Sequence, residues 1–268
     1  LNLTLSFDDL STLANFGDSD EANMKYKKLT DDNANFLALV SHYPDYEKSE
    51  LKNGGYATVT YVITSGGSKE KVSIDKKTDE TQFSGENAGI KINNADSVYL
   101  LTVSDRTYDM GKIDDFEKQN DFKLVDDCIA KLESVAEKYA GKNNFDYDKA
   151  LNNHLKIYQP QFDSVTLSLG DDSFDSNETL LKVQKGKKKI NSALAQRTYY
   201  AGRYAYLCCS GYSTSRLYGM WTGEFNTGWG SKYTMDANVN LQTSSMNTSN
   251  MSRSPIGYTY FILRQLPD

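Results

Sequence analysis

Apolar and polar residues alternate along the first part of the chain, up to about residue 105. A period of two residues is that of a β-strand whose two faces meet different surroundings. It predicts strands at Leu1–Phe7, Asn35–His42, Tyr56–Ile63, Gly89–Ile92 and Val98–Val103. Turn-forming residues separate several of them, in Asn53-Gly54-Gly55, Ser65-Gly66-Gly67 and Asn93-Asn94. Because one face of this sheet is apolar, we expect two antiparallel sheets stacked face to face.

From about Lys118 the apolar positions recur every three or four residues, which is the period of an amphipathic helix. The predicted elements are a helix ending near Gly141, a helix over Tyr147–Phe162 that contains Pro160, a strand at Val165–Leu169, a helix starting near Glu178 and a helix over Ser192–Ser210. Gly202 lies in the middle of the last helix and lowers its stability. We therefore expect Gly202 to allow close packing against a neighbour.

Composition and charge exclude several classes of protein. The chain has 268 residues, a net charge of −6 and no apolar run of about 18 residues, the minimum for a transmembrane helix. An acidic chain is a poor match for a nucleic acid or an anionic membrane surface. The basic run at 185–189 is interpreted as a solvated surface, with a phosphate or polyanion site as the alternative.

The small numbers of His and Cys argue against a metal centre. With two His and three Cys, a zinc site built from these ligands is not expected, and we predict neither a metal nor a cofactor. Cys128, Cys208 and Cys209 are interpreted as buried free thiols, since an odd number at this spacing forms no disulfide framework. The opening LNLTLSF alternates like a strand and does not have the pattern of a signal peptide.

The segment from Arg216 to Gln242 gathers side chains that suit a sugar. Exposed aromatic faces bind the apolar C–H face of a pyranose ring. The aromatic residues of this segment include both tryptophans of the chain and are Tyr218, Trp221, Phe225, Trp229 and Tyr233.

Polar side chains occupy alternate positions at the end of this segment, at Asp236, Asn238, Asn240 and Gln242. In an extended conformation they would share one face. An amide offers two donors and an acceptor, which matches sugar hydroxyls or a positioned water molecule. The structural alternative is a polar strand edge above a core that contains the tryptophans.

Three motifs follow one another here, GRYAYL (202–207), LYGMWTGEFNTGWGSKY (217–233) and NVNLQ (238–242). Their order resembles glycoside hydrolase family 95, whose members are mainly α-L-fucosidases with some α-L-galactosidases. The resemblance is loose before residue 90. It implies an α+β fold with a partial antiparallel β-sandwich (1–110), a helical linker with a short strand (111–187) and the first helices of an incomplete (α/α)6 barrel (188–268).

The resemblance also implies hydrolysis with inversion, in which one carboxyl group protonates the leaving oxygen and another activates water. The family has an Asn-x-Asn pair that helps to hold this water or its base. Counted from Trp229 without a gap, Asp236 and Asn238 fall on the pair; with a two-residue insertion, Asn238 and Asn240 do. The ungapped register is preferred because it keeps Asn250 in place.

The remaining expectations also come from the resemblance. Trp221, Trp229, Tyr233 and Gln242 are the expected substrate-binding residues, and the substrate is a glycan or oligosaccharide. The general acid Glu and the base Asp of the family lie downstream of these motifs. We therefore expect no turnover by the chain alone, a partner that supplies the rest of the barrel, and an extracellular or cell-envelope location.

Two other functions fit the same residues. A carbohydrate-binding module could use the aromatic and amide side chains to hold a glycan without cleaving it. A phosphorylase of related architecture would need a phosphate pocket, and the basic run at 185–189 is distant in sequence from the aromatic segment. The identity of the product, free sugar or sugar phosphate, distinguishes a phosphorylase from a hydrolase.

Overall fold

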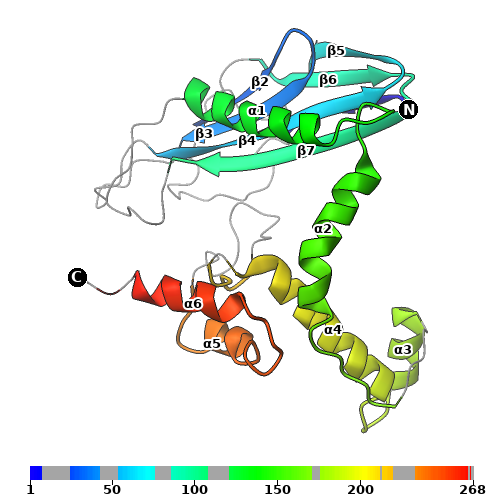
Figure 1. Ribbon diagram of the computed structural model, residues 1–268, viewed down its shortest axis with the longest axis vertical. Helices are drawn as coiled ribbons and strands as arrows, with labels where there is room; N and C mark the ends of the chain where they lie inside the picture. Colours follow the sequence, from blue (N-terminus) through cyan, green and yellow to red (C-terminus); the bar gives the residue numbers. More distant parts are fainter. Residues whose placement is uncertain are drawn as a thin grey trace. The chain divides into compact units, whose positions relative to one another are not determined.

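The computed structural model describes residues 1–7, 25–42, 54–75, 86–107, 121–170, 176–211, 213–219, 233–264 and 266. The chain has a mixed α+β fold, as predicted, with antiparallel strands first and helices after them (Figure 1). It forms two compact units, and the boundary falls within helix α2 (Tyr147–Phe162). The first unit contains Leu1–Leu151, and the described residues of the second lie in Asn152–Gly223 and Thr227–Asp268.

Two antiparallel sheets form most of the first unit. The larger sheet has the order β2 (Lys25–Thr30), β3 (Phe36–His42), β4 (Gly55–Ser65), β7 (Ser97–Arg106), and the smaller has the order β1 (Leu3–Leu5), β6 (Ala88–Asn93), β5 (Ser68–Ser73). All five strands predicted before residue 105 are present. The sequence did not indicate β2 and β5, because KYKKLT and SKEKVS are rich in lysine, which is depleted in strands.

The stacking of the two sheets is confirmed by a shared apolar core. Leu37 and Val62 of the larger sheet pack with Ile90 and Ile92 of the smaller one. Ile90, Ile92 and Val62 are fully buried. Removal of this apolar surface from water is the main force that holds the sheets together.

Helix α1 (Asp121–Lys138) covers the opposite face of the larger sheet (Figure 1). Val125, Cys128 and Leu132 of the helix pack on Ala57 and Val59 of β4. Successive side chains of a strand point to opposite faces, so β4 serves both cores, with Ala57 and Val59 toward the helix and Val62 toward the smaller sheet.

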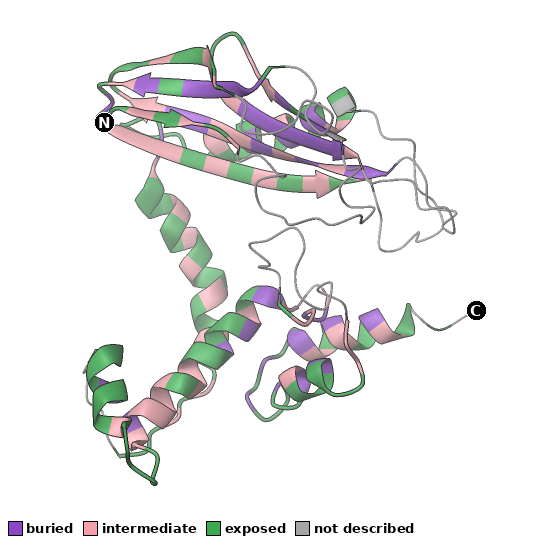
Figure 2. Ribbon diagram, turned by 180° about the vertical axis from the view of Figure 1, so that it is seen from behind, coloured by how far each residue is buried: buried purple, intermediate pink, exposed green. Residues whose placement is uncertain are grey.

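Strand β7 is an edge strand of the larger sheet and alternates between partly buried and exposed residues (Figure 2). Leu101 and Val103 pack against the core under α1. On the other face the hydroxyl groups of Thr102 and Ser104 each lie 2.9 Å from a threonine hydroxyl of β4. A row of hydroxyl pairs therefore lies on the exposed side of these two strands.

The predicted turn at Ser65-Gly66-Gly67 carries the chain from the larger sheet to the smaller one. Gly66 and Gly67 have φ angles of +68° and +65°, a conformation that glycine adopts without steric cost. A Cβ atom on Gly67 would lie 2.1 Å from the carbonyl oxygen of Asn93. Only glycine fits this position.

The second unit contains helices α3 (Asn177–Gln184), α4 (Ser192–Cys209), α5 (Asn238–Thr243) and α6 (Ser254–Leu263). The helices expected from Glu178 and from Ser192 are confirmed as α3 and α4. Both begin at a polar cap: the Ser176 hydroxyl accepts a hydrogen bond from the Thr179 amide (3.2 Å), and Asn191 Oδ1 accepts one from the Leu194 amide (3.0 Å).

The prediction of a strand at Val165–Leu169 is wrong, since no β-ladder forms there. Side chains of α4 take the place of a neighbouring strand. The Leu167 amide donates to the Tyr200 hydroxyl (2.8 Å) and the Leu169 amide to Gln196 Oε1 (3.0 Å). Apolar alternation thus indicated an extended segment correctly but not the partner that satisfies its backbone.

The expectation of close packing at Gly202 is also wrong. A Cβ atom built on Gly202 meets no heavy atom of the described residues within 4 Å. Close packing occurs instead at Gly257 in α6, where a Cβ atom would lie 2.9 Å from the carbonyl oxygen of Gly211. The glycine that permits a close approach lies in a helix that sequence periodicity did not reveal.

The three cysteines are free thiols in two environments. Cys128 and Cys209 are buried, as predicted, but Cys208 is exposed because its position on α4 faces away from the packed side. None of the helices in the described part of the chain is both long enough and apolar enough to cross a lipid bilayer.

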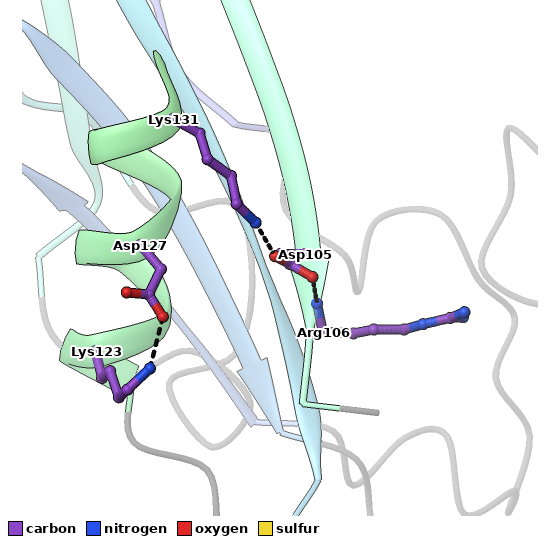
Figure 3. A network of polar contacts seen from close by, with 5 residues as sticks. All are labelled: Asp105, Arg106, Lys123, Asp127 and Lys131. Atoms are coloured by element: carbon purple, nitrogen blue, oxygen red, sulfur yellow. Dashed lines mark hydrogen bonds and ion pairs between the residues drawn. The ribbon is translucent and has the colours of Figure 1, made fainter. Parts of the chain in front are cut away.

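An ion pair links helix α1 to the edge strand β7 (Figure 3). Lys131 Nζ bonds to Asp105 Oδ2, and the Arg106 amide donates to Asp105 Oδ1 at 2.9 Å. Partial burial acts to raise the pKa of Asp105, but the bonds from Lys131 and Arg106 together hold it below its usual range. The same bond to Asp105 raises the pKa of Lys131.

We predict that Asp105→Asn lowers the free energy of unfolding of the first unit at pH 7. The lowered pKa means that Asp105 contributes stability above its unfolded pKa of about 3.9, and that this contribution disappears as the pH falls through the folded value. Because both side chains are partly exposed, the expected loss at pH 7 is about 0.5 kcal/mol, shrinking to nothing in acid. Urea unfolding at several pH values measures this loss of unfolding free energy, and hydrogen exchange of the α1 amides measures it at the helix.

Asp127→Asn is the matched control on the same helix. Asp127 pairs with Lys123 one turn earlier at 2.7 Å, and both side chains are largely exposed (Figure 3). Such a pair contributes a few tenths of a kcal/mol. An equal or larger effect of Asp127→Asn would contradict the assignment of the helix–strand link to Asp105.

Candidate functional site

A cavity of about 510 Å³ opens in the second unit on the side of α4 that carries Gly202. The segment after α4 and the region from α5 onward form its other walls. The lining includes Tyr199, Arg203, Tyr206, Ser215, Tyr218 and Gln242. The cavity therefore gathers aromatic, hydroxyl and amide groups, which are the side chains that bind sugars.

Arg203 is the one charged residue among those described that line the cavity. It is only 2% exposed, and four oxygen atoms accept hydrogen bonds from its guanidinium group. Nη2 donates to the Gln161 carbonyl (2.6 Å) and the Ser164 hydroxyl (2.9 Å), Nε to the Phe162 carbonyl (3.3 Å), and Nη1 to the Ser249 carbonyl.

The acceptors of Arg203 explain how a cation is tolerated inside the unit. Gln161 and Phe162 form the last residues of α2, where unpaired carbonyl groups give a helix its partial negative charge. The planar guanidinium group can reach several such carbonyls at once, which an ammonium group cannot do in the same geometry. Arg203 thus joins α4 to the end of α2 and to the segment before α6.

Gln242 and Ser215 connect α5 to the segment that follows α4. Gln242 Nε2 donates to the Leu217 carbonyl at 2.9 Å, and the Ser215 hydroxyl donates to Gln242 Oε1 at 2.9 Å. Ser215 is buried and Gln242 is half-buried. Both ends of the amide that the sequence assigned to substrate are therefore bonded to the protein.

Two acidic groups on α4 keep their protons more firmly than usual. Burial raises the pKa of Tyr206 to about 12, although the neighbouring Thr214 hydroxyl acts in the opposite direction. Burial also raises the pKa of the Cys209 thiol, against a smaller effect of Ser215. Both groups are neutral at pH 7, so this wall of the cavity has no anionic nucleophile.

The four polar residues that end the aromatic segment do not form one row. The expected extended conformation is wrong, because Asn238–Thr243 is helix α5, in which residues two apart do not share a face. Asp236, Asn238 and Asn240 are exposed and do not line the cavity. Asn240 Nδ2 donates to the Met235 carbonyl at 2.7 Å.

The aromatic residues are only partly described. The Tyr233 ring packs on Phe261 of α6, with centroids 4.3 Å apart and planes inclined by 33°, and Tyr218 lines the cavity. Trp221, Phe225 and Trp229 lie outside the described residues. The structure thus brings Gln242 and Tyr218 to one cavity and places Tyr233 in an aromatic pair against α6.

Sequence reasoning missed the roles of Arg203 and Ser215. Arg203 stands in the GRYAYL motif, and a charged residue among aromatic and apolar ones on a helix was a signal of burial. Its acceptors are backbone carbonyls from distant segments, which no side-chain pattern reveals. For Ser215 the sequence offers no signal.

The described residues provide no group of three His, Cys, Asp or Glu side chains that could hold a metal ion. What they provide is a helical unit with a mainly apolar cavity that aromatic rings line, and exposed carboxylate and amide groups at Asp236, Asn238 and Asn240. These features fit the catalytic domain of a glycoside hydrolase.

Comparison with known families gives the relationship directly. Residues 146–263 match the model of the glycosyl hydrolase family 95 catalytic domain. The match confirms the resemblance over these residues, which include α2 to α6, and relates this segment to that family. No curated protein matches the chain.

We predict that Arg203→Met destabilises the second unit by about 3 kcal/mol or more. The change leaves the buried Ser249 carbonyl and the partly buried Phe162 carbonyl without the donor that they have in Arg203, and each unpaired buried group costs about 1–3 kcal/mol. Thermal or urea unfolding, followed by hydrogen exchange of the α4 amides, measures the loss.

Arg197→Met on the same helix serves as the control. Arg197 donates to Asn177 Oδ1 at 2.9 Å and is only partly buried, so its replacement should cost about 1 kcal/mol or less. Equal losses for the two variants would show that the carbonyl contacts of Arg203 contribute no more than an ordinary surface bond.

Proposed function

We propose that the chain contributes the opening part of the catalytic domain of an inverting glycoside hydrolase that acts on α-L-fucosides or related α-L-glycosides of glycans. The match of residues 146–263 to the family 95 catalytic domain carries this proposal. The domain boundaries that we propose are a β-sandwich at 1–110, a helical linker at 111–187 and the start of the catalytic barrel at 188–268.

The proposed catalytic residues are Asp236, Asn238 and Asn240. Their exposure at the start of α5 supports this, because groups that hold an attacking water must be reachable from solvent. The carboxylate or amide oxygen accepts a hydrogen bond from the water, and an amide N–H donates one to the water oxygen and fixes its orientation. Trp221 and Trp229 would stack on the sugar ring.

Inversion requires two carboxyl groups about 6.5–9.5 Å apart, one to protonate the leaving oxygen and one to activate the water. We propose that the general acid Glu and the base Asp come from the rest of the barrel, as the resemblance to the family implies. Asp236 and its neighbours then hold the water or the base but do not replace the acid. An extracellular or cell-envelope location is part of the same proposal.

The outer face of α6 supports a partner of this kind. Ile256, Tyr260 and Leu263 are 54%, 55% and 54% exposed, and their spacing of four and three residues places them on one side of the helix. An apolar stripe on a helix is normally covered by another element. Further helices of the barrel are the proposed cover.

We predict that the polypeptide carrying the whole barrel releases β-L-fucose first from an aryl α-L-fucoside, whereas residues 1–268 alone give no turnover. Proton NMR of the nascent product distinguishes its anomer. Release of α-L-fucose would contradict inversion, and release of a sugar phosphate in phosphate buffer would favour the phosphorylase. Binding of L-fucose without product from the whole barrel would favour a carbohydrate-binding module.

Substitutions in the same polypeptide identify the register of the water-holding pair. Asn238→Ala should lower kcat about 100- to 1,000-fold, since it removes an oriented hydrogen-bonding group at the reacting centre in either register. A similar loss in Asp236→Ala but not in Asn240→Ala supports the ungapped register, and the reverse supports the insertion. Asn247→Ala, an exposed residue beyond α5, is the control and should leave kcat unchanged.

A further inference from the structure

We propose that Gln242 is a positioning residue whose side-chain amide fixes Ser215–Gly219 to helix α5 and thereby holds Tyr218 in the wall of the cavity. This role differs from the direct sugar contact that the sequence indicated. It rests on the proposed function, because the cavity wall that carries Tyr218 would then belong to the sugar-binding site.

The two hydrogen bonds of Gln242 reach the same short segment from one side chain. Nε2 donates to the Leu217 carbonyl and Oε1 accepts from the Ser215 hydroxyl, both at 2.9 Å. The partners are 25 and 27 residues away in sequence, so each bond closes a long loop. Two bonds from a planar group hold both the position and the direction of the segment.

The chemistry of the partners allows one orientation of the amide. A carbonyl oxygen can only accept, so the Leu217 carbonyl requires an N–H group opposite it. If the amide were reversed, two carbonyl oxygens would face each other. The acceptor end is then directed to Ser215, whose single hydroxyl proton lies within reach of Gln242 Oε1 and of the Arg216 carbonyl, both at 2.9 Å.

Helix α5, which carries Gln242, is itself fixed in the second unit. Val239 of α5 is fully buried, and the Thr243 hydroxyl donates to the Val239 carbonyl at 2.9 Å. The burial of Val239 and Thr243 fixes α5, whereas the bond between them lies within the helix. The Gln242 amide transmits that fixed position to the segment across the cavity.

The clamped segment ends in a tight turn. The Gly219 amide donates to the Arg216 carbonyl at 2.9 Å, and Gly219 has a φ angle of +67°, which favours glycine. Trp221 follows two residues later. A shift of Leu217 would move its neighbour Tyr218, which lines the cavity.

Hydrogen exchange of residues 215–219 in the chain 1–268 tests the clamp without any ligand. We expect Gln242→Met and Gln242→Glu each to speed exchange of the Gly219 amide roughly tenfold at pH 7, because neither side chain can then donate to Leu217. At about pH 4 the glutamic acid is partly protonated and can donate again. The Gln242→Glu variant should therefore approach the wild-type exchange rate in acid, and Gln242→Met should not.

The controls separate the clamp from a general loss of folding. Leu241→Gln changes the neighbouring residue of α5, which is 72% exposed, and should leave exchange at 215–219 unchanged. Amides of β4 in the first unit report whether each variant is folded. Wild-type exchange at Gly219 in both Gln242 variants would overturn the proposal.

Titration of the polypeptide that carries the whole barrel with L-fucose, monitored by tryptophan fluorescence, tests the link to binding. If the proposal holds, Gln242→Glu weakens binding at pH 7 and recovers together with the exchange rate in acid. Weakened binding with unchanged exchange means that Gln242 contacts the sugar directly, and overturns the positioning role. Absence of binding by the wild type contradicts the proposed function, while the exchange result still decides whether the clamp exists.

Discussion

The second unit depends on the buried guanidinium group of Arg203. Helix α4 shares an apolar cluster with Met246 and Met251, but α2 has no buried residue and α3 buries only Leu180. Arg203 instead collects carbonyl groups from the end of α2 and from the segment before α6. A buried cation that lost these acceptors would face a large desolvation cost. The arrangement that forms the cavity is therefore tied to the position of a single side chain.

The first unit depends on apolar packing on both faces of β4, and the sequence predicted part of this packing. The alternation in Tyr56–Ile63 gave the strand and its two faces, but the sequence did not show that α1 covers one of them. Helix α1 is separated from the sheet in sequence, and its apolar face fits a helix or a sheet equally well. Local periodicity indicates which face of an element is buried but not which other element packs on that face.

The candidate site was predicted in composition but not in conformation. The GRYAYL and NVNLQ motifs, which were singled out because their order resembles a known family, contribute Arg203, Tyr206 and Gln242 to the cavity. The polar residues from Asp236 to Gln242 were expected in an extended row, and α5 overrides that pattern. Propensity is weak for Asn and Asp in either element, so tertiary contacts such as those of Gln242 decide the outcome. Backbone acceptors, on which Arg203 and Gln242 both rely, carry no sequence signature.

The acceptors of Arg203 have a consequence for how the chain responds to acid. Guanidinium groups stay charged and carbonyl oxygens do not titrate in the range where proteins fold. The hydrogen bonds from Arg203 to backbone carbonyls therefore do not depend on pH. The link between α1 and β7 in the first unit relies on the Asp105 carboxylate and loses its charge in acid. A drop in pH would therefore loosen the sheet-bound helix while the junction around the cavity keeps its bonds.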